Sequence, residues 1–193
     1  MPRVYLSPSV QEYNQFHSGG TEEQYMNLIA DAIEPYLIAS GIEFGRNNPN
    51  KPLGDAINES NMGNYDLHVA IHSNAAPENL SGQIRGTDIY YSPNSYYGRE
   101  FAKILQNNFK NIYPTPDEVE ILPTTTLREI RRTTAPAALI EVAYHDNPED
   151  EAWIKNNINQ IAEAIALSIA EYFGVPFVAP MIDEDSFVTY NLF

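Results

Sequence analysis

Apolar residues recur along the chain with two different periods. Short runs that alternate with polar residues, or that are apolar throughout, predict strands, and longer stretches with a period near 3.6 predict helices. Strands are predicted at residues 3–6, 42–44, 65–72, 87–91 and 137–141. Helices are predicted at residues 21–40, 53–62, 97–112 and 149–173. This alternation predicts an α/β fold, a single domain whose mostly parallel twisted sheet carries helices on both faces.

The predicted helix after Thr21 has the clearest local signals. Thr21 followed by Gln24 fits a capping box, in which the threonine hydroxyl accepts a hydrogen bond from the backbone three residues on. One apolar face then follows at helical spacing, and Gly41 ends the helix. The residues of that face are Met26, Ile29, Ala30, Ile33 and Leu37.

The length of 193 residues suits one well-buried domain and is too short for two. We expect residues 1–174 to form this domain. The remaining segment, 175–193, contains prolines and then an acidic run at 183–185. We expect it to be a C-terminal tail that packs on the domain or leads to a missing region.

Charge and cysteine content exclude several partners. The net charge is −15 with only 11 Lys and Arg residues, so nucleic acid and anionic membrane surfaces would be repelled. No apolar run reaches 18 residues, so no membrane span is expected. The start of the chain lacks the apolar core of a signal peptide, which leaves an intracellular protein, lysis release and a trimmed leader open. With no cysteine, a metal site must use histidine and carboxylate ligands.

Two predicted strands end in residues that suit catalysis. His72 follows the apolar run of residues 67–71, at the type of position where open α/β sheets place ligands. The same residue also fits a core histidine that is hydrogen-bonded to backbone. Glu141 comes directly after four apolar residues, 137–140, and a carboxylate there is costly to bury without a partner or a task. We therefore interpret Glu141 as a functional residue.

The other candidates have simpler alternatives. His17 lies in a polar loop and can be a metal ligand or a solvated side chain. Glu23 lies in the first turn of its helix, where the helix dipole favours an acid without any metal, and Glu22 offers the same benefit. His68 precedes His72 by four residues, so on a strand the two leave the backbone about 13 Å apart. Both can hardly bind one ion, and we expect His68 to be structural or to support the site.

Four short blocks, in order, resemble the zinc-dependent N-acetylmuramoyl-L-alanine amidases of the amidase-3 type, which cleave peptidoglycan. Glu23 with Asn27 resembles a metal-binding Glu and the Asn that follows it. Residues 72–75, His-Ser-Asn-Ala, resemble a strand end whose His binds zinc. Residues 132–141 resemble the segment that leads into the catalytic Glu, and Asn147 fits the Asn six residues after it. The resemblance covers about residues 3–174.

One block departs from the family. The family has a zinc-binding His in an Asp-Pro-Gly-His-Gly loop after its first strand, whereas residues 7–11 here read Ser-Pro-Ser-Val-Gln. Either His17 supplies the ligand from a remodelled loop, or the site has two protein ligands and binds metal weakly. With His17 the resemblance implies zinc bound by His17, Glu23 and His72, and Glu141 as the catalytic base.

The resemblance implies hydrolysis of the amide between N-acetylmuramic acid and L-alanine in peptidoglycan, and an extracellular or cell-wall location. Two other functions stay open: a zinc peptidase or carboxypeptidase that acts on stem peptides, and a non-catalytic cell-wall binding module with a degraded metal site. The oligomeric state is not indicated.

Overall fold

The computed structural model describes residues 1–181 of the chain. These residues form a six-stranded sheet with strand order β2-β1-β3-β6-β4-β5. The strands are β1 (Arg3–Pro8), β2 (Glu43–Arg46), β3 (Leu67–Asn74), β4 (Thr87–Tyr91), β5 (Val119–Pro123) and β6 (Ala137–Tyr144). All neighbouring strands pair in parallel except β4 and β6, which are antiparallel. The predicted fold class is confirmed.

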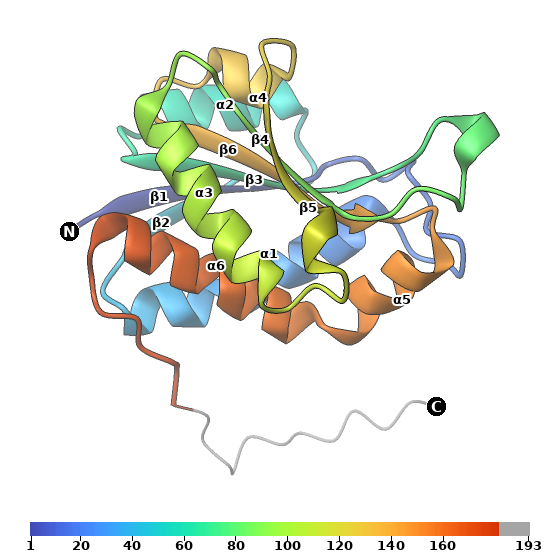
Figure 1. Cartoon of the computed structure of the whole chain (residues 1–193). Helices are drawn as coiled ribbons and strands as arrows, with labels where there is room; N and C mark the ends of the chain where they lie inside the picture. The colour runs from blue at the N-terminus through green and yellow to red at the C-terminus, as the bar shows by residue number, and fades with distance from the viewer. Residues whose placement is uncertain (182–193) are drawn as a thin grey trace.

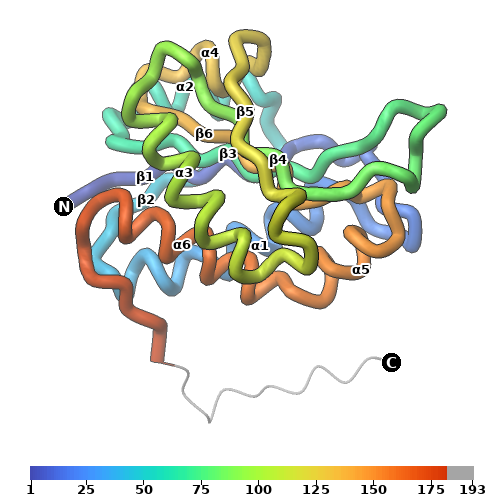
Figure 2. The backbone as a smooth tube through the Cα atoms, in the orientation of Figure 1, coloured from blue at the N-terminus to red at the C-terminus, as the bar shows by residue number. Residues whose placement is uncertain are grey.

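Helices cover both faces of this sheet (Figure 1). They are α1 (Glu22–Ala39), α2 (Leu53–Met62), α3 (Tyr96–Lys110), α4 (Arg128–Arg132), α5 (Pro148–Asn156) and α6 (Ile158–Phe173). Helices α1, α3 and α6 lie together on one face, and α2 and α4 lie on the other (Figures 1 and 2). The structure places no helix in residues 1–181 that is long and apolar enough to cross a bilayer.

The two faces of the sheet differ in chemistry. The main apolar core lies under α1, α3 and α6 and includes Leu6, Val69 and Ile140. The α4 face has a much smaller apolar cluster, formed by Ala70, Ile130, Ala137 and Leu139. Because side chains alternate along a strand, the residues between the core positions of β3, His68 and His72, point to the α4 face. This face is where polar groups gather.

Four elements differ from the prediction. The predicted helix over 149–173 is two helices, α5 and α6, separated at Asn157. The Asn157 side chain donates a hydrogen bond to the Trp153 carbonyl, and such local bonds compete with helix continuation. The strand that holds Glu141 continues to Tyr144, because Val142 and Ala143 are also buried. Strand β5 and the short helix α4 had no apolar pattern strong enough to predict them.

The C-terminal segment is described as far as residue 181. Its first part packs on the domain: Phe177 stacks on Tyr36 with ring centroids 5.6 Å apart, and the Val178 amide donates to the Ser40 hydroxyl at 3.0 Å. The remainder of the predicted tail, residues 182–193, lies outside the described residues. The boundary at 174 stays a prediction.

Candidate active site

His72 and Glu141 lie side by side in the sheet. They are register partners in the parallel pair of β3 and β6, so their side chains leave the same face of the sheet. Both line a cavity of about 290 Å³, together with Leu53, the segment 126–129 that leads into α4, Leu139 and Gln11. The two strand-end residues are thus brought to one cavity.

His72 is held between two buried carboxylates. Its Nδ1 lies 2.9 Å from Oε1 of Glu22, and its Nε2 lies 3.0 Å from Oε2 of Glu129. Burial disfavours a charge on the imidazole, but the hydrogen bonds to Glu129 and Glu22 outweigh it and raise the pKa of His72 well above its ordinary value. The same pairing lowers the pKa of Glu22 despite its burial.

Glu129 joins the two histidines of β3. Its Oε1 lies 3.2 Å from Nε2 of His68, and it also accepts a hydrogen bond from the Ser7 hydroxyl at 2.5 Å. Burial alone would favour a neutral Glu129, but the two histidines lower its pKa far below the ordinary value. On its other side, Nδ1 of His68 lies 2.9 Å from the Ser60 hydroxyl of α2. His68 is therefore part of the buried support under the site.

Glu141 is in a different state from the other two carboxylates. Its Oε2 atom is buried and has no hydrogen-bond partner among the described residues. Burial raises the pKa of Glu141 to about 7, although the neighbouring His72 acts in the opposite direction. A carboxyl group with a pKa near neutrality can take up and release protons under physiological conditions, which is what a general base or acid needs.

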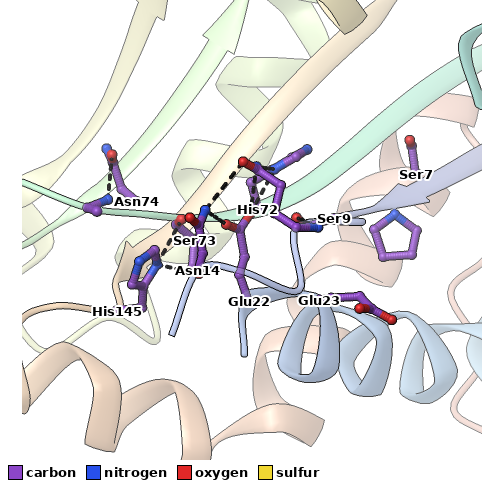
Figure 3. Close-up of polar contacts among 12 residues, drawn as sticks. Ser7, Ser9, Asn14, Glu22, Glu23, His72, Ser73, Asn74 and His145 are labelled. Atoms are coloured by element: carbon purple, nitrogen blue, oxygen red, sulfur yellow. Dashed lines mark hydrogen bonds and ion pairs between the residues drawn. The ribbon is translucent and has the colours of Figure 1, made fainter. Parts of the chain in front are cut away.

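The first turn of α1 directs Glu22, not Glu23, toward His72 (Figure 3). Thr21 caps the helix by accepting a hydrogen bond from the Gln24 amide at 3.1 Å, which sets the phase of the first turn. Glu22 lies four residues before Met26 and so continues the buried face of α1, whereas Glu23 is half-buried and points away from His72. The helical phase was visible in the sequence and could have favoured Glu22.

His17 is exposed to solvent in the loop before α1. No hydrogen bond within residues 1–181 joins it to His72, Glu22 or Glu23. The loop is held elsewhere: Ser18 donates to the carboxylate of Glu151 through both its amide and its hydroxyl. The structure therefore places His72 at the centre of the site and does not bring His17 or Glu23 to it, and the expected ligand set stays a prediction.

Gln11 lies in the loop after β1, and its side chain lies next to His72. Its Nε2 lies 3.4 Å from Oε1 of Glu22 and 3.4 Å from Nδ1 of His72. Neither Gln11 nor Glu129 was a candidate in the sequence. Glu129 lies in a short charged segment without periodicity, and only the tertiary structure brings it under His72.

The two polar residues after His72 stabilise the surroundings of the site. The Ser73 hydroxyl lies 2.9 Å from Nδ1 of His145, whose ring stacks on Phe16. Asn74 donates to the carboxylate of Asp88 at 3.0 Å. Asn147 caps α5 by accepting hydrogen bonds from the amides of Glu149 and Asp150.

Comparison with known proteins identifies the family. Residues 10–171 match the model of a family described as N-acetylmuramoyl-L-alanine amidase. The chain belongs to this amidase family. No curated protein sequence matches the chain significantly.

Solved amidases share the fold. The N-acetylmuramoyl-L-alanine amidase AmiC2 of Nostoc punctiforme superposes with a TM-score of 0.77 at 20% identity, over 90% of this chain and 97% of that one. The catalytic domain of the amidase CwlV from Bacillus (Paenibacillus) polymyxa gives 0.77 at 22% identity, over 91% and 100%. The catalytic domain of the CD27L endolysin, which targets Clostridia difficile, gives 0.70 at 20% identity, over 89% and 98%. At these identities the likeness supports the fold alone.

Proposed function

We propose that this amidase-family protein is a peptidoglycan hydrolase that cleaves the amide bond between N-acetylmuramic acid and L-alanine with a bound zinc ion. The observation that carries the proposal is the placement of Glu141. In this member of the family, a buried carboxylate, one of whose oxygens has no hydrogen-bond partner in the described part of the chain, lines a cavity beside a paired histidine. Such a group lowers stability, and active sites are where this cost is commonly retained.

The side chains around His72 match a zinc site in part. Among residues 1–181 no group of three or more His, Cys, Asp or Glu side chains is arranged to hold a metal. Two atoms that can bind a metal nevertheless lie 2.9 Å apart: Nδ1 of His72 and Oε1 of Glu22. Glu129 accepts from the opposite ring nitrogen, an arrangement that in metal sites leaves the first nitrogen free to bind the ion. We therefore propose Glu22 and His72 as ligands.

Each of the four residues of the proposed site then has a separate role. Glu22 and His72 would hold the ion, which when bound supplies Lewis-acid activation of water and of the scissile carbonyl. Glu141 would take the proton from the water as it attacks the scissile carbonyl. It would return this proton to the amine of L-alanine as the amide bond to N-acetylmuramic acid breaks. Glu129 would keep the imidazole of His72 in the tautomer that binds metal through Nδ1.

The arginines of α4 suit a peptide substrate. Arg128, Arg131 and Arg132 are exposed, and none of them forms an ion pair with a carboxylate of residues 1–181. Arg128 also lines the cavity with His72 and Glu141. In a chain of net charge −15 this is a local excess of positive charge. It complements the carboxylates of a stem peptide, which arginine binds in bidentate fashion. Because the proposed substrate is peptidoglycan, we propose that the protein acts in the cell wall.

One experiment separates the candidate functions. Purified protein is incubated with sacculi, and the products are identified by mass spectrometry. An amidase releases intact stem peptides that begin with L-alanine and leaves free glycan strands. Fragments cut within the stem peptide would instead indicate a peptidase. Binding to sacculi without any released product would indicate a wall-binding module, which the missing first histidine favours.

A further inference from the structure

Three side-chain atoms form a small triangle beside the cavity, which His72 and Gln11 line. Nδ1 of His72 and Oε1 of Glu22 are 2.9 Å apart, and Nε2 of Gln11 lies 3.4 Å from each of them. In a tetrahedral zinc site with bonds of about 2.0–2.2 Å, two ligand atoms lie about 3.3 Å apart. The triangle therefore has the dimensions of three ligands around one ion.

No arrangement of protons satisfies all three sides of this triangle. The carboxylate of Glu22 only accepts hydrogen bonds and the amide nitrogen of Gln11 only donates them. If Nδ1 of His72 donates to Glu22, Nε2 of Gln11 can also donate to Glu22, and the side between Nδ1 and Nε2 of Gln11 stays without a hydrogen bond. If Nδ1 accepts from Gln11, then two acceptors face each other at 2.9 Å. A cation at the centre, with the amide of Gln11 turned to present Oε1, satisfies all three atoms.

The charge around the triangle independently favours a cation. Glu22, Glu129 and Glu141 are three carboxylates around the imidazole of His72, and Glu129 is also paired with His68. The buried Oε2 of Glu141 has no hydrogen-bond partner among residues 1–181. Buried negative charge is stable only where it is paired or coordinates a metal.

We propose that Gln11 is the third protein ligand of the metal and takes the place of the family's absent loop histidine. This inference rests on the proposed metal-dependent function and specifies its site. The loop after β1 brings the residue to the site, because the Ser9 amide donates to the Ile71 carbonyl of β3 at 2.9 Å. The backbone N–H of Gln11 in turn donates a hydrogen bond to the Ser9 hydroxyl at 3.1 Å.

The side chain of Gln11 is held at its outer end. Its Oε1 accepts from the Tyr13 hydroxyl at 2.9 Å and from Nδ2 of Asn14 at 3.3 Å. A half-turn of the amide exchanges its oxygen and nitrogen, and the Tyr13 hydroxyl can then accept from Nε2. Asn14 keeps its hydrogen bond to Oε2 of Glu22, at 2.5 Å. The ligand can therefore form without a change of the backbone.

The donor set has a consequence for metal preference. The proposed ligands are one imidazole, one carboxylate and one amide oxygen. In the sense of hard and soft ligands, this set is harder than the two histidines and one glutamate that the resemblance implies. Imidazole suits zinc, whereas carboxylate and carbonyl oxygens suit manganese and magnesium. Gln11→His should therefore tighten zinc binding much more than manganese binding.

The test measures binding of Zn²⁺ and Mn²⁺, each as the metal alone, to chelator-treated protein by isothermal titration calorimetry. Gln11→Ala should weaken zinc binding at least about tenfold, and Gln11→His should strengthen it by a similar factor. Gln15→Ala is the matched control, because Gln15 is an exposed glutamine of the same loop whose side chain donates to the Glu12 carbonyl. Circular dichroism of every variant reports folding.

Two results overturn the inference: zinc affinity of Gln11→Ala equal to that of the wild type, and a wild-type protein that binds no zinc. Sacculus digestion by the same preparations judges the proposed function separately. If Gln11→Ala binds zinc normally and the wild type releases stem peptides, the ligand assignment fails and the amidase function stands. If zinc binding follows the prediction but no peptide is released, the function fails and the metal site stands.

Discussion

His72 and Glu141 are direct register partners on β3 and β6, so the proposed metal ligand and the proposed base leave one face of the sheet on neighbouring strands. The pairing between these strands shifts after His72, between residues 72 and 74. Such an irregularity re-aims side chains beside functional sites. Both groups are thus presented by strands of the sheet, and sites built on strands are positioned more precisely than sites built on loops.

Glu141→Gln should abolish hydrolysis and leave the fold and the metal content unchanged. Glutamine keeps the volume but cannot take the proton from water, so turnover of sacculi should fall by at least about 10²-fold. Glu120→Gln, at an exposed position of β5, is the control and should keep full activity. Near-normal turnover by a folded, metal-bound Glu141→Gln variant would remove Glu141 from the mechanism.

The same substitution should stabilise the metal-free protein at high pH. Burial raises the pKa of Glu141 to about 7, compared with about 4.3 for a glutamate in an unfolded chain. Below about pH 4.3 both states hold the proton and there is no effect. Between about pH 4.3 and pH 7 the unfolded state releases this proton while the folded state still holds it, so stability falls as the pH rises, and the full loss is reached above pH 7.

Urea denaturation of chelator-treated protein at pH 4.5 and pH 8 measures this difference. Glu141→Gln should raise the free energy of unfolding by on the order of 2 kcal/mol at pH 8 and leave it nearly unchanged at pH 4.5. An equal effect of the substitution at both pH values would contradict the assignment of a raised pKa to Glu141.

Adjacent glutamates on α1 should behave differently. Glu22→Gln removes the carboxylate that faces His72 and should weaken zinc binding by orders of magnitude, whereas Glu23→Gln should bind zinc like the wild type. His17→Ala should also keep its zinc, because the side chain is exposed. The zinc content of each variant after mild chelation shows which of these residues bind the metal. Loss of metal from the Glu23 and His17 variants, with metal retained by Glu22→Gln, would restore the ligand set expected from the sequence.

Glu129 is predicted to be a positioning residue. Glu129→Ala removes the acceptor on Nε2 of His72 and should weaken zinc binding about 10- to 100-fold. Its loss also leaves His68 without a partner on Nε2. His68→Ala is the comparison: it should lower thermal stability but change zinc affinity little, since His68 does not contact the triangle. Equal zinc affinities of wild type and Glu129→Ala would argue for a purely structural role.

The arginines of α4 should act on substrate binding. Arg128→Glu should raise KM for sacculus fragments that carry free stem-peptide carboxylates and leave kcat largely unchanged, because the side chain lines the cavity without contacting Glu141 or His72 by a hydrogen bond. Arg99→Glu, on α3, is the control with the same change of charge. Equal effects of both substitutions would indicate general electrostatics instead of a binding site.

Much of the fold could be predicted from the sequence, because periodicity and end signals are local. The apolar face of α1 begins at a threonine cap, and the apolar runs of β3 and β6 stop at His72 and Glu141. These patterns predicted the α/β class and both strand-end residues of the site. They placed no element at β5 or α4, whose short segments bury few residues and leave no periodic trace.

The composition of the site was decided by the tertiary structure. Helical phase, which the sequence does show, turns Glu22 rather than Glu23 toward the sheet. Strand pairing, which it does not show, brings His72 beside Glu141, 69 positions further along the chain. Glu129 reaches His72 only because α4 packs on β6, and Gln11 reaches it only because the loop after β1 is tied to β3. A side chain's chemical type can be read along the chain, but its partners depend on packing between segments that are distant in sequence, and no local pattern encodes those contacts.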